Sequence, residues 1–235
     1  MRVKKLVSSL GATPSAQQAT AEMSRLINQR KYAKAVRFGA AIMESDISRK
    51  DAKFMFQLLL AYRLNGDGYM ADAYWPQVKE YDGYTPLMEV DFHRDAVLAL
   101  IRSRRLDEAG ELLKQEHGIP KGDTPENSAR RGAHAMALGL LIMAKGDYYR
   151  SLLALGVAGA MLSRGNEPQW ILNNEFHSMV LESSVGNTIQ ARCLARNIRA
   201  KDPSRRKHQV ARLVIISSYL GRWWLRRVAS LLIRL

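Results

Sequence analysis

Residues 138–151 read LGLLIMAKGDYYRS, and this stretch gives the clearest indication of how the chain folds. An apolar run ends at the turn Lys145-Gly146-Asp147, and Tyr148 then opens a second run whose apolar residues have helical spacing. A short polar turn between two such runs is typical of two helices that fold back on each other. The stretch therefore predicts one helix–turn–helix hairpin.

The same arrangement occurs six times along the chain. Each copy has a small or polar turn, then one mostly aromatic or apolar residue, then the first turn of a new helix. The copies are RKYAKA (30–35), DGYMAD (67–72), RRLDEA (104–109), KGDYYRS (145–151), GNTIQA (186–191) and GRWWLR (221–226). Their marker residues, 37, 37, 42, 40 and 35 residues apart, are Tyr32, Tyr69, Leu106, Tyr148, Thr188 and Trp223. Such separations match one helical hairpin each, so we expect a repeat array.

Local signals favour helices throughout. Apolar residues recur at intervals of three and four, and no run alternates β-branched with polar residues. Thr124-Pro125 has the N-cap residue and first-turn proline of a helix start, and Pro168 follows a turn in the same way. Asn187 and Gln190 are spaced as in a capping box. We expect an all-α protein.

The repeats resemble the tetratricopeptide repeat family, whose unit has about 34 residues. The family has a small residue three positions after the aromatic, where its two helices approach closely, and Ala35, Ala109 and Ala191 stand at that position. Leu138-Gly139 match the Leu-Gly pair of the family's first helix, and Asp202-Pro203 match its helix-ending Asp-Pro. The chain departs from the family in lacking the first helix's tryptophan and in its longer spacings.

The resemblance implies a right-handed α-solenoid of about six stacked hairpins in a single domain, residues 15–235, after a basic flexible N-terminus, residues 1–14. In this family a groove lined by the first helix of each pair usually takes an extended peptide or a partner helix. The implied function is therefore that of a scaffold or adaptor for a protein or peptide partner, by analogy with the fold.

Catalytic signals are missing from the sequence. None of the five histidines has the spacing of a zinc site, alone or with Cys193, and no P-loop, dinucleotide-binding or Gly-x-Ser-x-Gly motif occurs. Cys193 lies at helical spacing between Ile189 and Arg196, which favours a small core residue over a reactive thiol. We expect a non-enzyme without a cofactor or metal.

The charge is concentrated at one end of the sequence. The chain holds 36 basic and 22 acidic residues, and residues 192–235 hold twelve basic residues and a single acid, Asp202. Since a solubilising cap would mix glutamate with lysine, this excess predicts an anionic partner. The expected anion-binding or nucleic-acid-binding residues are Arg192, Arg196, Arg199, Lys201, Arg205, Arg206, Lys207, Arg212, Arg222, Arg226 and Arg227.

The chemistry of that partner stays open. Nucleic acid suits arginines on one helix face, yet no recognised nucleic-acid-binding motif is present. An anionic membrane surface suits the last helix, which has a cationic and an apolar side. An acidic protein segment suits the fold best.

The last segment also predicts a docking surface, because the final hairpin of a solenoid has a neighbour on one side only. The expected docking residues are Trp223, Trp224, Val228, Leu231, Leu232 and Leu235. Their partner would be a second copy, another protein or an anionic membrane. The competing interpretation is that this helix folds back and is buried by the preceding pair.

The sequence also bears on the cellular compartment of the protein. No apolar run reaches the roughly 18 residues needed to span a bilayer, and the first ten residues lack a secretory pattern. Together with the single cysteine, this indicates a cytoplasmic protein. A transit peptide for an organelle is the alternative, because no acid precedes Glu22.

Overall fold

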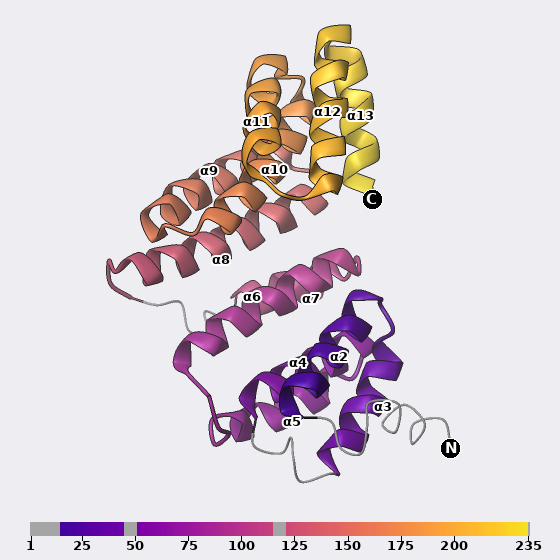
Figure 1. The fold of residues 1–235 in the computed structure, drawn as a ribbon, viewed down its shortest axis with the longest axis vertical. Helices are drawn as coiled ribbons and strands as arrows, with labels where there is room; N and C mark the ends of the chain where they lie inside the picture. The colour runs from indigo at the N-terminus through magenta and orange to yellow at the C-terminus, as the bar shows by residue number, and fades with distance from the viewer. Residues whose placement is uncertain (1–14, 45–50, 115–120, 235) are drawn as a thin grey trace. The chain divides into compact units, whose positions relative to one another are not determined.

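The structure is a computed structural model that describes residues 15–44, 51–114 and 121–234. The predicted flexible segment, residues 1–14, lies outside these ranges. Twelve α-helices account for most of the described residues, with no strand among them (Figure 1). The helices are α2 (Ala16–Asn28), α3 (Tyr32–Met43), α4 (Ala52–Asn65), α5 (Gly68–Val78), α6 (Pro86–Arg102), α7 (Leu106–Lys114), α8 (Pro125–Ala144), α9 (Tyr148–Gly165), α10 (Pro168–Val185), α11 (Thr188–Lys201), α12 (Arg205–Leu220) and α13 (Arg222–Arg234). The prediction of an all-α fold is confirmed for this part of the chain.

The expected helix starts are in place. Helix α8 begins at Pro125, where the Thr124 side chain accepts a hydrogen bond from the Asn127 backbone N–H, and α10 begins at Pro168. The Asn187 side chain accepts one from the Gln190 N–H at the start of α11. These caps satisfy backbone donors that a helix's first turn leaves without a partner.

The six marker residues all fall at the start of the second helix of a pair. Tyr32, Leu106, Tyr148 and Thr188 are each the first residue of their helix. The other two markers are one residue off this register, because Gly68 begins α5 and Arg222 begins α13. Tyr69 and Trp223 are accordingly exposed second residues. Aromatic character was therefore a poorer guide to the register than the turn before it.

A position that repeats more strictly is the fourth residue of each second helix. It is buried in all six pairs and small in five of them: Ala35, Ala71, Ala109, Ser151, Ala191 and Leu225. The α8–α9 pair shows the reason. There the buried Ser151 hydroxyl donates to the Gly139 carbonyl at 2.7 Å, and a Cβ on Gly139 would lie 2.8 Å from the Leu155 side chain. Two helices that approach this closely leave no room for larger residues.

The chain divides into two compact units, Met1–Ala99 and Leu100–Leu235, with the boundary inside α6. The first unit has an aromatic cluster in which Phe92 stacks on Phe56 and Trp75, with ring centroids 5.2 and 5.0 Å apart. In the second unit, each helix from α7 to α13 contacts the next one along the chain. The expectation of a single domain over residues 15–235 stays a prediction.

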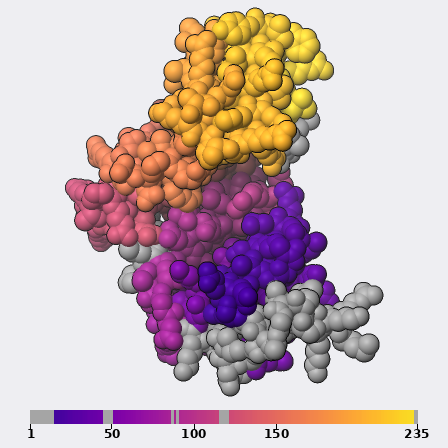
Figure 2. Space-filling view, in the orientation of Figure 1, coloured from indigo at the N-terminus to yellow at the C-terminus, as the bar shows by residue number. Residues whose placement is uncertain are grey.

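The end of the second unit has its own apolar cluster, which positions the surfaces discussed below. Helix α13 contacts both α10 and α12. Its Leu225 is buried with Met179, Val180, Ala191, Ala195, Ile198, Ala211 and Val214. The outer surfaces of α12 and α13 are seen in yellow in Figure 2. None of the helices in the described ranges has the length and apolar character needed to cross a bilayer.

Candidate functional site

Helices α11, α12 and α13 run antiparallel, so their residues separate into two ends (Figure 1). At one end, residues 202–204 join α11 to α12. At the other end, Gly221 joins α12 to α13, and the turn between α10 and α11 lies beside it. Arg226 holds these two turns together, because its Nη2 donates a hydrogen bond to the Val185 carbonyl oxygen at 3.0 Å.

The turn between α11 and α12 is built around Asp202, the only acid in residues 192–235. Pro203 cannot continue the preceding helix, and the Ser204 side chain caps α12. The buried Asp202 carboxylate accepts hydrogen bonds from Lys207 Nζ at 2.8 Å and from the Ser204 N–H at 2.8 Å. Lys207 Nζ also donates to Asn173 Oδ1 of α10 at 2.6 Å. The segment's single carboxylate is thus fully used inside the fold.

The hydrogen bonds to Asp202 also lower the pKa of its carboxyl group. Burial acts to raise the pKa of this carboxyl, but the Lys207 ammonium and the Ser204 N–H outweigh it and hold the pKa below its ordinary value. Asp202 therefore stays ionised and stays bonded to Lys207 at neutral pH.

Four cations surround this turn without any partner. We call Arg199, Lys201, Arg205 and Arg206 the basic turn surface. All four are exposed, and no hydrogen bond or ion pair to another described residue is found for them. Arg212 and Arg222, further along α12 and α13, are in the same state. Mutual repulsion among these cations is therefore not offset by a salt bridge within the described residues.

The sequence even places cations where they weaken the helix. Arg205, Arg206 and Lys207 fill the first turn of α12, which has no acid. Helix N-termini carry a partial positive charge, so each added cation there costs about 0.3–1 kcal/mol. Arg199 and Lys201, in the last turn of α11, have the favourable orientation instead.

The remaining predicted cations are held by the protein itself. Arg192 is half-buried, donates to the hydroxyl and carbonyl oxygens of Ser218, and lies 3.9 Å from the Tyr219 ring centroid. Arg196 donates to the Tyr219 hydroxyl at 3.1 Å. Arg226 bonds to Val185, as described, and Arg227 lies 5.0 Å from the Trp223 ring centroid. Of the three predicted arginines at helical spacing along α11, Arg192 and Arg196 are therefore held by contacts, and Arg199 is free.

The predicted docking residues also separate into two groups. Trp223, Trp224 and Leu231 are exposed, and the two indole rings meet edge to face with centroids 4.9 Å apart. Val228 and Leu232 are half-buried, and Leu232 packs on the apolar cluster. Leu235 lies outside the described residues. One side of α13 is thus covered by the fold, as the burial interpretation expected, and the other side is uncovered.

Sequence reasoning missed an apolar stripe on α12. Leu213, Ile216 and Leu220 are exposed, whereas Ala211 and Val214 face the core. The signal was present, since the helix has two apolar stripes and the one with larger side chains is the outer one. Ile189 at the start of α11 and Tyr219 are also exposed.

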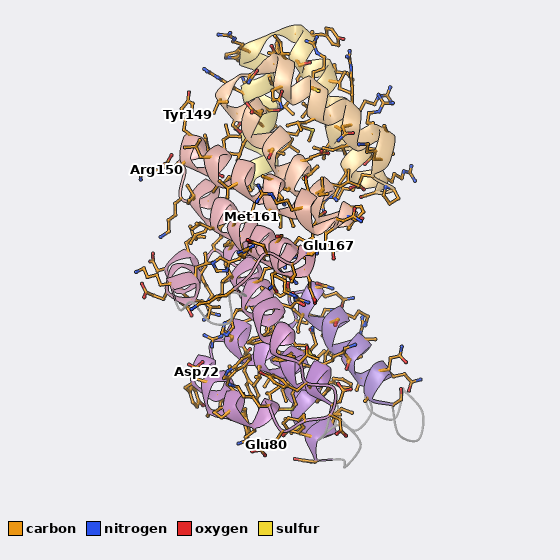
Figure 3. All side chains as sticks on the ribbon, turned by 90° about the vertical axis from the view of Figure 1, so that its left-hand side faces the viewer. Asp72, Glu80, Tyr149, Arg150, Met161 and Glu167 are labelled. Carbon is orange, nitrogen blue, oxygen red and sulfur yellow. The ribbon has the colours of Figure 1, made fainter. Side chains whose placement is uncertain are left out.

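Helix α9 has a further exposed stripe. Tyr149, Leu153 and Val157, four residues apart, point away from the unit, as Tyr149 does in Figure 3. Arg150, next to Tyr149 in the sequence, forms an ion pair with Asp147, with Nε and Oδ2 3.4 Å apart. The α9 stripe therefore resembles the exposed residues of α12 and α13 in size but lacks their surplus of arginines.

One thiol and one imidazole in the second unit have environments that the structure describes. Cys193 is exposed, so its interpretation as a core residue was wrong. Desolvation lowers the pKa of His177 to about 4, with Lys207 and Arg102 adding to the shift, so this imidazole is neutral at pH 7. Within the described ranges, no three His, Cys, Asp or Glu side chains gather as a metal site would need.

A scan against protein-family models, a search of curated proteins and a search of solved structures each find no match to this chain.

Proposed function

We propose that the protein is a non-enzymatic interaction scaffold of tetratricopeptide-like repeats stacked in a right-handed solenoid, and that its basic turn surface binds an acidic segment of a partner protein. The six helix pairs and their buried fourth residues support the repeat architecture. They do not by themselves name a partner.

The observation that supports an acidic partner is that the Asp202 carboxylate is already bonded within the fold. This carboxylate is buried and bonded to Lys207, so it is not available to Arg199, Lys201, Arg205 and Arg206, which pair with no acid among the described residues. Two of these cations also lie in the first turn of α12, where they destabilise the helix. Charge that works against folding is typical of a binding surface.

An acidic polypeptide fits this surface better than nucleic acid. Binding to single strands usually adds base stacking on aromatic side chains to phosphate contacts. The exposed aromatic residues of α12 and α13, Tyr219, Trp223 and Trp224, lie at the opposite helix ends. The basic turn surface therefore offers charge without a stacking platform.

Fluorescence anisotropy with a labelled glutamate-rich peptide tests the proposal. The variant R199Q/K201Q/R205Q/R206Q should bind the peptide about tenfold more weakly or worse, because four charges leave one surface. The control R37Q/K53Q/K79Q/K121Q removes the same charge from exposed positions elsewhere and should bind as the wild type does. Equal losses in both variants would indicate a nonspecific effect of net charge.

A labelled single-stranded oligonucleotide separates the two partner classes. If nucleic acid is the partner, the oligonucleotide binds more tightly than the peptide at equal salt. Each lost phosphate contact should then lower the log–log salt slope by about 0.7. That outcome, with the slope lowered in the basic turn variant, would replace the acidic protein segment by nucleic acid.

A further inference from the structure

We propose that the opposite end of these helices is a second binding site, which seats in the headgroup region of an anionic lipid bilayer. We call Ile189, Tyr219, Leu220, Trp223 and Trp224 the apolar end. This site shares no residue with the basic turn surface, so the inference goes beyond the proposed function.

The apolar end exposes large side chains that a folded protein normally covers. The exposed fractions are 79% for Ile189, 63% for Tyr219, 61% for Leu220, 59% for Trp223 and 48% for Trp224. Single exposed apolar residues are common on protein surfaces, but a group of this size marks an interaction site.

Contacts between the helices bring these residues together. Arg226 bonds to the Val185 carbonyl, and its guanidinium lies against Gly186, so the start of α13 adjoins the turn before Ile189. Arg192, one turn after Ile189, bonds to Ser218 beside Tyr219. The five apolar residues therefore come from two adjoining turns at one end of the helices.

The charges that α11, α12 and α13 bring to this end are all positive, as anionic lipids require. Arg192, Arg196, Arg222, Arg226 and Arg227 lie among the apolar residues, and Asp202 is the only acid from Ser183 onward. The nearest acid before them, Glu182, is half-buried, and burial raises its pKa while Asn187 bonds to it. Each cation close to an anionic membrane surface contributes about 1 kcal/mol of attraction.

The residue types favour a bilayer over a protein groove. Tryptophan and tyrosine concentrate at membrane–water interfaces, and arginine can extend its charge to the headgroups while its stem stays in apolar surroundings. Arg192 on the Tyr219 ring and Arg227 on the Trp223 ring are such pairs. Because the apolar end is made of turns at the helix ends, it suits a flat interface.

Helix geometry limits the depth of this contact. Interfacial segments enter the headgroup and acyl boundary by about 5–10 Å. Leu231 lies seven residues after Trp224, which is about 10 Å along a helix. Insertion end-on would therefore cover the apolar end and leave Leu231 and Leu213 outside the bilayer.

Co-sedimentation of the full chain with vesicles tests the proposal. The vesicles are phosphatidylcholine alone, or phosphatidylcholine and phosphatidylserine in equal parts. The wild type should sediment with the mixed vesicles only. The variant L220S/W223S/W224S should bind them about tenfold more weakly or worse, because the inserted apolar area is lost.

A matched control removes apolar surface from another place in the same unit. The variant Y149S/L153S/V157S changes three exposed residues of α9 and should bind the mixed vesicles as the wild type does. The variant R222Q changes an exposed cation without a partner and should weaken binding about fivefold. Circular dichroism should show unchanged helix content in every variant, because all of these side chains are exposed.

Three results would overturn the proposal. The first is a wild type that does not sediment with the mixed vesicles. The second is binding that persists in L220S/W223S/W224S but is lost in the basic turn variant, which would assign it to charge at the other end. The third is self-association that L220S/W223S/W224S abolishes, which would make a second copy the occupant. Peptide binding by the basic turn surface is measured separately, so each proposal can fail alone.

Discussion

The two ends of α11, α12 and α13 carry arginines drawn from the same basic segment, yet they hold them in different ways. At the apolar end, Arg192 and Arg226 donate to carbonyls in the last turns of α12 and α10, Ser218 and Val185. Those carbonyls lack helical partners and carry partial negative charge, so arginine stabilises them. At the basic turn surface, Arg205 and Arg206 meet a helix N-terminus and remain in solvent. Whether an arginine is structural or available thus depends on which helix end it meets.

The largest effect is expected beneath the basic turn surface. Lys207→Met leaves the buried Asp202 carboxylate without its cation, which should lower the free energy of unfolding by about 3 kcal/mol. Urea denaturation measures the loss. The double variant D202N/K207M also removes the charge of the Asp202 carboxylate and should recover part of the lost free energy of unfolding. A loss below about 1 kcal/mol in K207M would mean that the turn does not depend on this pair.

A smaller loss is expected at the apolar end. Arg226→Met keeps an apolar stem but removes the hydrogen bond to Val185, and should cost about 1 kcal/mol in urea denaturation. Arg222→Met is the matched control, since this neighbouring arginine is exposed and has no partner. Equal stability of the two variants would contradict the structural role assigned to Arg226.

The smallest effect has the opposite sign. R205E/R206E puts acids at the N-terminus of α12, where the helix dipole favours them. At high salt, which screens most of this interaction, the variant should raise the free energy of unfolding by about 0.5 kcal/mol. The same variant should abolish binding of the glutamate-rich peptide. A gain in stability with a loss of binding would sharpen the contrast between the two ends. A variant that is destabilised would show that these arginines serve the fold.

Much of the fold was predictable because its signals are local. Thr124-Pro125, Pro168 and Asn187 cap helices through contacts within a few residues of sequence, and the structure has helix starts at each. The turn residues likewise mark the break between the two helices of each pair. Tyr69 and Trp223 placed the starts of α5 and α13 one residue too late, because an aromatic residue near a helix start need not be buried.

The candidate site was less predictable because it depends on contacts far apart in the sequence. Asp202 was recognised as the only acid of its segment, but its bond to Lys207 and the contact of Lys207 with Asn173, 34 residues away, needed the structure. The exposed apolar stripe of α12 was missed for a related reason. Ala191, Ala195 and Ala211 share one cluster, and small residues allow the helices to approach closely. The bulkier Leu213 and Ile216 are consequently left outside.

The position of α13 also has a consequence during synthesis of the protein. Helix α13 contacts α10 as well as α12, and its Leu225 completes a cluster begun by Met179 and Val180. A chain leaves the ribosome with its N-terminus first, at about 5–20 residues per second. At that rate, α10, α11 and α12 are outside the ribosome for up to about a second before Leu225, which closes their core, follows them. We therefore expect protease to cleave within α10–α12 in nascent chains that stall after Leu220 has emerged but before Leu225 has. Chains whose α13 has emerged should resist cleavage there.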